Sequence, residues 1–318
     1  MAVAVCSEEE FIAVWRRLGS VTLVAKELKI SVRQVQNRRR RIEGRHNITL
    51  DATNDQRIYK ILHTENQIQS VANITGPVIV FSDAHFMPDE PSVGFDALIK
   101  VIKKIKPTMI VANGDILDGG TISKYAPEGW PGKTKPTLKQ ELEAVQFYMD
   151  GIVKACKGLG VILHRTIGNH DIRFEKRLAG LVPEYKDIQG TRLSDHIPEW
   201  TVSWSVLVND NTMIKHRLQH SGIHSNFQNV LKSGLSTCSG HTHLLEVKGW
   251  GDYTGRRWGV STGMLANPDS QAFHYLENNP TPWCQGFAIL TYDNNGRLLP
   301  PELCEVIDSV AYFRGSSI

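Results

Sequence analysis

The chain has 318 residues and a formal net charge of +3, and 41% of its residues are hydrophobic. This length suits one large domain and one small domain. Its five scattered cysteines form no C-x-x-C pair, and the sequence shows neither a signal peptide nor an apolar run of membrane length. We therefore expect a reduced, cytoplasmic protein of a bacterium or a phage-infected host, without a membrane partner, rather than a disulfide-stabilised secreted domain.

The first 46 residues predict a small all-α domain. Residues 8–18 repeat apolar side chains at helical spacing, and Ser20 and Ser31 are candidate N-caps of two further helices, the last running to about Glu43. Helix, short turn and helix with this spacing resemble a helix-turn-helix domain of the factor-for-inversion or resolvase kind, although Lys29 stands where glycine is commoner in the turn. The residues expected to face inward are Phe11, Ile12, Trp15, Leu18, Val32, Val35 and Ile42.

The third of these helices is strongly basic. Residues 1–48 contain ten Lys or Arg and five Asp or Glu, so they carry +5 while the rest of the chain carries −2. Arginines concentrated on a recognition helix are typical of binding to nucleic acid, DNA being the first choice. The alternative is a helical docking or oligomerisation module, and a homo-oligomer stays open because helix-turn-helix domains often dimerise. The candidate nucleic-acid contacts are Arg33, Gln34, Asn37, Arg38, Arg40 and Arg41.

Residues 47–76 are polar and predict a linker, after which residues 77–318 predict a larger α/β domain. In this domain, short β-branched runs such as 78–82, 109–112 and 161–163 favour buried strands, and each leads to Asp, His or Asn. Extended segments point residues i and i+2 the same way, so Asp83 and His85 could both reach one ion. The polar fragments are Asp83-Ala-His85, Gly114-Asp115, Gly168-Asn169-His170-Asp171 and, further on, Gly240-His241-Thr242-His243.

Oxygen and imidazole donors without thiolates suit two divalent metals held close together, a kind of site that hydrolyses phosphate esters. The order D-x-H, GD, GNHD, His and GHTH resembles the calcineurin-like metallophosphoesterase family over roughly residues 77–300, including the stand-alone phosphoesterases of phages and prophages. The resemblance implies a four-layer α/β/β/α sandwich with two metals at the C-terminal ends of strands.

The resemblance also implies roles for single residues. One metal would be held by Asp83, His85 and His243, the other by Asn169, His241 and one upstream histidine, and Asp115 would bridge them. His170 would not be a ligand; it would stabilise charge in the transition state or protonate the leaving oxygen. Manganese is the first choice of metal, and iron, zinc or nickel suit the same donors.

The upstream histidine departs from the family pattern, which usually shows His-Gly after a strand. His216 directly follows the strand predicted at residues 212–215 and is the preferred ligand. His220, followed by Ser-Gly, is the alternative ligand and otherwise a candidate substrate contact, and His224 could line the same cleft.

The chemistry expected of this site is hydrolysis. Two cations lower the pKa of a bridging water, and the hydroxide attacks phosphorus in line with the leaving oxygen. Asp171 could act in catalysis by orienting His170 or could contact groups behind the metal ligands, and Asp118 either supports the site or is a turn residue. Arg173 and Arg177 would share a helix face and either grip substrate phosphates or remain solvated.

Two aromatic and basic segments are further candidates for substrate contact. Residues 119–139 would overhang the site, with Lys124, Lys133 and Lys135 guiding a polyanion, or would only pack as a surface loop. Residues 249–258 would form a hairpin. The predicted function is a metal-dependent nuclease or DNA phosphodiesterase targeted by the helix-turn-helix. One alternative is a phosphomonoesterase or a small-molecule or cyclic-nucleotide phosphodiesterase with an N-terminal docking module; another is a DNA-binding regulator whose esterase activity is incidental.

Overall fold

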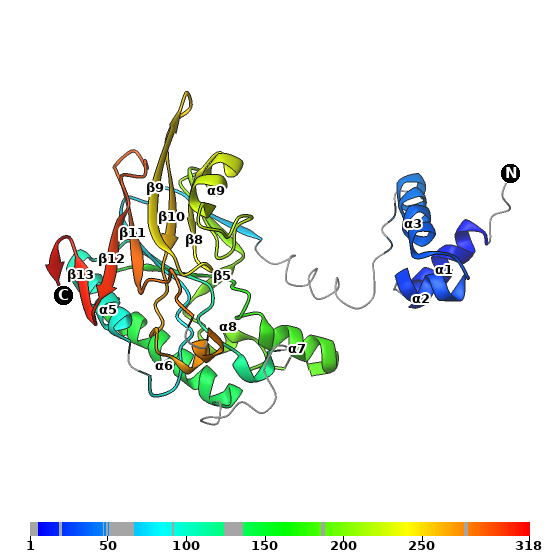
Figure 1. The fold of residues 1–318 in the computed structure, drawn as a ribbon, viewed down its shortest axis with the longest axis horizontal. Helices are drawn as coiled ribbons and strands as arrows, with labels where there is room; N and C mark the ends of the chain where they lie inside the picture. Colours follow the sequence, from blue (N-terminus) through cyan, green and yellow to red (C-terminus); the bar gives the residue numbers. More distant parts are fainter. Residues whose placement is uncertain are drawn as a thin grey trace. The chain divides into compact units, whose positions relative to one another are not determined.

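The computed structural model describes residues 6–18, 21–46, 48, 50, 67–90, 92–123, 136–185, 188–276 and 279–318 (Figure 1). The chain divides into two compact units: Met1–Glu65 with Ala179–Pro183, and Asn66–Leu178 with Glu184–Ile318. The cap expected at Ser20 and the lysines at 124, 133 and 135 lie outside the described residues. The domain limits at 46/47 and 76/77 stay predictions. No helix among the described residues is long and apolar enough to cross a membrane.

The N-terminal unit contains three helices, α1 (Glu8–Leu18), α2 (Val21–Glu27) and α3 (Val32–His46). Its core is made by Phe11, Trp15, Val35 and Ile42, which are almost completely buried. The prediction that Val32 points inward is wrong, because this side chain is 44% exposed. Val32 is the first residue of α3, which starts where the Ser31 hydroxyl accepts the amide N–H of Gln34 and the Gln34 side chain accepts that of Ser31.

The second unit contains two β-sheets. The eight-stranded sheet has the order β14-β13-β12-β11-β2-β3-β4-β5, in which β2, β3, β4 and β5 run parallel. Its strands are β2 (Gly76–Phe81), β3 (Met109–Asn113), β4 (Ile162–Thr166), β5 (Thr201–Ser203), β11 (Gly286–Tyr292), β12 (Glu302–Ile307), β13 (Val310–Phe313) and β14 (Ser316–Ser317).

The six-stranded sheet has the order β1-β6-β7-β8-β10-β9 and includes the parallel pair β7 and β8. Its strands are β1 (Ile68–Val71), β6 (Ser205–Val208), β7 (Thr212–Ile214), β8 (Ser236–Ser239), β9 (Leu245–Asp252) and β10 (Gly255–Thr262). The helices of this unit are α5 (Val93–Ile105), α6 (Leu138–Ala155), α7 (Arg173–Leu181), α8 (Leu193–His196) and α9 (Ser225–Ser233), with 3₁₀ turns η1 (Gly120–Ile122), η2 (Pro183–Tyr185) and η3 (Gln271–Leu276).

The strand β2 shows how these parts form layers. Its alternate side chains Ile79 and Phe81 join the hydrophobic cluster with α5 and α6, whereas Val78 and Val80 join the cluster between the two sheets. The helix α9 packs against β8, β9 and β10 of the six-stranded sheet. Helices therefore cover both outer faces of two stacked sheets, which confirms the α/β/β/α fold (Figure 1).

Candidate metal centre

The Asp, His and Asn residues of the predicted site follow the C-terminal ends of strands from both sheets. Asp83 and His85 follow β2, Asp115 follows β3 and Asn169 follows β4, all in the eight-stranded sheet. In the six-stranded sheet, His216 follows β7, while His241 and His243 follow β8. Because the carboxyl ends of parallel strands meet at one edge, the two sheets bring these fragments together.

The local backbone differs from the extended conformation that the sequence predicted. Asp83 and His85 have φ angles of 52° and 38°, and His241 and His243 have 68° and 57°. These values lie in the left-handed region, which non-glycine residues rarely adopt. Asp83 and His85 therefore reach one cluster through tight turns and not through strand alternation, while His241 and His243 reach two different clusters. Strain of this kind is held by surrounding structure and is concentrated at functional sites.

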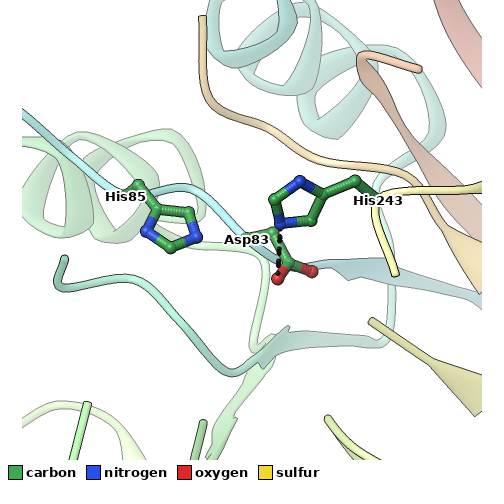
Figure 2. Close-up of side chains that lie close together, drawn as sticks. All are labelled: Asp83, His85 and His243. Atoms are coloured by element: carbon green, nitrogen blue, oxygen red, sulfur yellow. Dashed lines mark ion pairs between the residues drawn. The ribbon is translucent and has the colours of Figure 1, made fainter. Parts of the chain in front are cut away.

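A first cluster is formed by Asp83, His85 and His243, which offer ligand atoms within 4.8 Å of one another. His243 Nε2 lies 3.3 Å from Asp83 Oδ1, with His85 beside the pair (Figure 2). The other carboxylate oxygen of Asp83 is fixed by the Ser82 hydroxyl and by the amide N–H of His241 at 2.9 Å. The cluster is therefore buried, preorganised and rich in metal-ligand atoms.

A second cluster contains Asp115, His216 and His241, again within 4.8 Å. His216 Nε2 lies 3.0 Å from Asp115 Oδ2. His220 belongs to neither cluster; its backbone N–H and C=O bond the Asn229 side chain of α9. The geometry thus favours His216 over His220 as the upstream ligand. His220 as a substrate contact stays a prediction.

The atoms of both clusters are suited to divalent cations. Among the described residues, His85 Nε2 and Asn169 Oδ1 are buried without a hydrogen-bond partner, whereas Asp83 Oδ1 and His216 Nε2 are buried against His243 and Asp115 of their own clusters. Such atoms are costly unless a ligand satisfies them. The other ring nitrogen of His216 faces the Asn113 carbonyl oxygen at 2.8 Å, and that of His85 faces Asp118 Oδ1 at 3.1 Å. A histidine held this way presents its free nitrogen to a metal.

The ionisation of these residues also favours cations. Burial opposes a charged His216, but the negative charges of Asp115 and Asp83 outweigh burial and raise the pKa of His216 to about 10. Burial and the neighbouring His216 lower the pKa of His241 to about 4. The histidines offset the burial of Asp83 and keep its pKa lowered, at about 2. Carboxylates that stabilise a proton on His216 would equally stabilise a metal in its place.

His170 lies next to the clusters and is held by two other residues. Its Nδ1 lies 3.1 Å from Asp118 Oδ1, and an Arg173 guanidinium nitrogen lies 2.9 Å from its Nε2. Burial opposes the charged form, but the hydrogen bond to Asp118 and the charge of Asp115 outweigh it and raise the pKa of His170. His170 also offers a ring nitrogen within 4.8 Å of ligand atoms of His85 and Asp115. Arg177 contacts only the Ile122 carbonyl oxygen, at 3.4 Å, among the interactions of the described residues.

The Asp171 side chain binds backbone amide groups of the site. Its carboxylate accepts amide N–H groups of Asp115, Ile116, Leu117 and Gly168 at 2.9–3.2 Å. This bonding fixes the turn that carries Asp115. The orientation of His170 by Asp171 stays a prediction.

Sequence reasoning missed two buried charged residues that support this turn. Arg165 in β4 is 3% exposed and lies 3.8 Å from the Asp171 carboxylate. Glu141 in α6 is 1% exposed and accepts the Gly119 N–H at 2.6 Å, next to Asp118. A signal was available for Glu141, a charged residue on the otherwise apolar face of α6, since such residues are rarely buried without a partner. The sequence Ile162-Leu-His-Arg-Thr166 of β4 offers no such pattern for Arg165.

Two glycines of the motifs are required by close packing. A Cβ added at Gly168 would lie 2.0 Å from Asp115 Oδ1, so no other residue fits there without displacing that carboxylate. Gly114 has a φ of 80°, and a Cβ there would lie 2.6 Å from the His216 ring. Glycine at these points permits the turns to approach the ligands.

Comparison with known proteins agrees with this site. Residues 76–245, just over half of the chain, match the model of the calcineurin-like phosphoesterase family. The chain belongs to this family, and it is a metal-dependent phosphoric ester hydrolase. The match ends earlier than the roughly 300 expected from the motifs, although the fold continues to the C-terminus. No curated protein matches the chain.

Several solved structures are similar at low identity. A phosphoesterase from E. coli, Yfce, shows 14% identity and a TM-score of 0.33, covering 71% of this chain and 97% of its own. A protein serine/threonine phosphatase from Saccharomyces cerevisiae shows 12% identity and 0.36, covering 80% and 88%. The Pseudomonas putida nuclease MPE shows 14% identity and 0.30, covering 70% and 86%.

Proposed function

We propose that this phosphoesterase hydrolyses phosphodiester bonds of DNA and is targeted to DNA by its N-terminal helices acting as a helix-turn-helix. The observation that carries the DNA assignment is the set of exposed side chains on α3. Arg33, Asn37, Arg40 and Arg41 are exposed and, within the described part of the chain, have no side-chain partner. Unpaired cations on one helix are suited to a phosphate backbone.

Other α3 residues are already occupied within the unit. Arg38 donates to the Cys6 carbonyl oxygen and lies 5.4 Å from the centre of the Phe11 ring, and Arg39 pairs with Glu43 at 2.9 Å. Gln34 caps its own helix. We therefore place the main DNA contacts on Arg33, Asn37, Arg40 and Arg41, with Arg38 and Gln34 contributing through the position of α3. Lys29, with a φ of 51°, forms the left-handed turn before α3.

In the site, Asp83, His85 and His243 would hold one divalent ion, and Asn169, His216 and His241 the second, with Asp115 shared. Manganese is the ion we propose. Such ions would polarise phosphate oxygens and lower the pKa of a bound water, which would supply the hydroxide nucleophile near neutral pH. Asp118 keeps His170 oriented toward the clusters, where the imidazole would stabilise charge in the transition state or, once Arg173 turns from Nε2 to the phosphate, protonate the leaving oxygen. Arg173, beside that nitrogen, supplies a positive charge for the phosphate.

The test uses the full-length, manganese-loaded protein with labelled single- and double-stranded DNA and with bis-p-nitrophenyl phosphate. The wild type should cut DNA and the small diester, and His170→Ala should lose both activities. Arg40→Ala/Arg41→Ala should weaken only the cutting of DNA, whereas Arg16→Ala, an exposed arginine on α1, should change neither. Turnover of the small diester without any cutting of DNA would overturn the DNA assignment and leave the phosphoesterase intact.

A further inference from the structure

The strands β9 and β10 form a ribbon that extends beyond its sheet. They pair with each other along their whole length, from Gly255–Asp252 to Thr262–Leu245. The strand β10 pairs with β8 only over Gly259–Ser261, so in the outer half of the ribbon the strand ladder joins β9 and β10 alone (Figure 1). At the start of this half, the Arg257 side chain donates to the Gly234 carbonyl oxygen and the Trp258 N–H donates to the Ser236 hydroxyl. We call this outer half, residues 248–258, the ribbon arm.

The ribbon arm is aromatic and basic. Tyr253 at its turn is completely exposed, and Arg256 lies 4.6 Å from the centre of the Trp258 ring. Asp252, the one acidic residue of the arm, forms an ion pair with Arg257 and accepts a hydrogen bond from Trp250 Nε1 at 3.2 Å. Within the described residues, Lys248 and Arg256 have no acidic partner. The arm therefore presents two unpaired cations and a free aromatic ring.

A glycine lets aromatic and basic side chains of the arm pack against each other. Gly249 stands opposite Trp258, and a Cβ at Gly249 would lie 2.5 Å from an Arg256 guanidinium nitrogen. The missing side chain thus lets Arg256 lie across the strand against Trp258. Trp250 packs on Phe227 of α9, with ring centres 5.1 Å apart, which anchors the arm from its other face.

The base of the ribbon lies at the metal centre. β9 starts two residues after His243, and the Thr262 hydroxyl at the end of β10 lies 2.6 Å from that of Ser82, next to Asp83. Eight residues of strand place the tip about 25 Å from this base. At ~3.4 Å per nucleotide of a duplex strand, that length corresponds to roughly seven nucleotides.

We propose that the ribbon arm binds the DNA substrate beyond the cleavage point, with Tyr253 stacking on a base and Arg256 contacting a phosphate on the face opposite Trp250 and α9. The polyanion is complementary to the charge left on the arm, and stacking on exposed aromatic rings is the usual partner of such cations in nucleic-acid binding. This inference rests on the proposed function, because it concerns the substrate of the same site.

The test compares Tyr253→Ala and Arg256→Gln with the wild type in the full-length protein. Substrates are bis-p-nitrophenyl phosphate, a DNA dinucleotide and a long DNA strand. Both variants should raise KM for the long strand at least roughly fivefold and leave the two small substrates unchanged. Controls are Tyr312→Ala on β13, at the far edge of the other sheet, and Arg297→Gln, an exposed arginine after β11.

Each outcome bears on one claim. If the variants and the wild type have equal kinetics on the long strand, the proposed DNA binding by the ribbon arm is wrong, while the proposed DNA hydrolysis is unaffected. A wild type that cuts only the small diester would overturn DNA hydrolysis itself and the arm with it. A change of oligomeric state with Tyr253→Ala in sedimentation, without a change in KM, would assign the arm to a second copy of the chain and overturn its contact with DNA.

Discussion

The two units of this protein use charge in opposite ways. In the phosphoesterase unit, Asp83, Asp115 and His216 are at most 2% exposed and depend on one another. In the N-terminal unit, Arg40 and Arg41 are exposed and the core consists of apolar side chains such as Phe11 and Trp15. A buried charge is destabilising unless it has a fixed partner, whereas an exposed charge is solvated by water and needs no partner. Substitutions should therefore have large, local effects in the first unit and small, cumulative effects in the second.

The largest effect is expected at Gly168. Gly168→Ala places a Cβ on the Asp115 carboxylate, which must move, so turnover of bis-p-nitrophenyl phosphate should fall at least about a hundredfold, as expected when reacting groups shift by an ångström. The control is Gly180→Ala in α7, where an added Cβ meets nothing within 4 Å. Normal turnover by Gly168→Ala would show that the turn is less rigid than the buried charges require.

The next largest effect is expected at Asp118, which contacts both His85 and His170 at 3.1 Å. Asp118→Asn removes the charge and keeps an oxygen acceptor, so kcat or metal affinity should fall about 10–100-fold. Steady-state kinetics and manganese titration separate the two effects. Asp150→Asn, on α6 and away from these contacts, is the matched control, and equal behaviour of the two variants would remove Asp118 from the site.

A smaller effect on stability is expected at Glu141. Burial and the charge of Asp118 raise the pKa of Glu141 from 4.5 to about 7. The folded state therefore favours the protonated acid, so this stabilisation is complete below about pH 4.5 and is lost as the pH rises through 7. Glu141→Gln keeps an acceptor for Gly119 and stays neutral, so it should increase the free energy of unfolding at pH 8 by about 1–3 kcal/mol.

Urea unfolding of the metal-free protein at pH 5 and pH 8 measures this difference. Glu143→Gln, an exposed position two residues further along α6, is the control and should follow the wild type at both pH values. If the free energy of unfolding changes equally between pH 5 and pH 8 in Glu141→Gln and in the wild type, the Glu141 carboxyl is charged in the folded protein.

The smallest effects are expected on α3. Each of Arg40→Ala and Arg41→Ala should reduce the slope of log affinity against log salt by about one, and the double variant by about two. Fluorescence anisotropy with DNA over a range of salt measures the slope. Arg39→Ala, which removes a residue paired with Glu43, should change the slope less. If all three variants change the salt slope equally, the exposed arginines Arg40 and Arg41 contribute no more to DNA binding than Arg39, which is paired with Glu43.

The local elements of the fold were accessible from the sequence. The strands predicted at 78–82 and 109–112 correspond to β2 and β3, and the helix at 8–18 to α1, because apolar periodicity is a local property. The error at Val32 arose at a helix start, where capping and not periodicity decides which side chain is covered.

By itself, the sequence determined the donor set of the site, its order along the chain and the excess of arginine on α3, since these depend only on residue identity. The tertiary structure decided the rest. It placed His216 and not His220 beside Asp115, it put Asp83 and His85 in left-handed turns, and it buried Arg165 and Glu141 beneath the site. These features depend on two sheets meeting at one edge, and contacts between residues so far apart along the chain leave no local pattern to predict them.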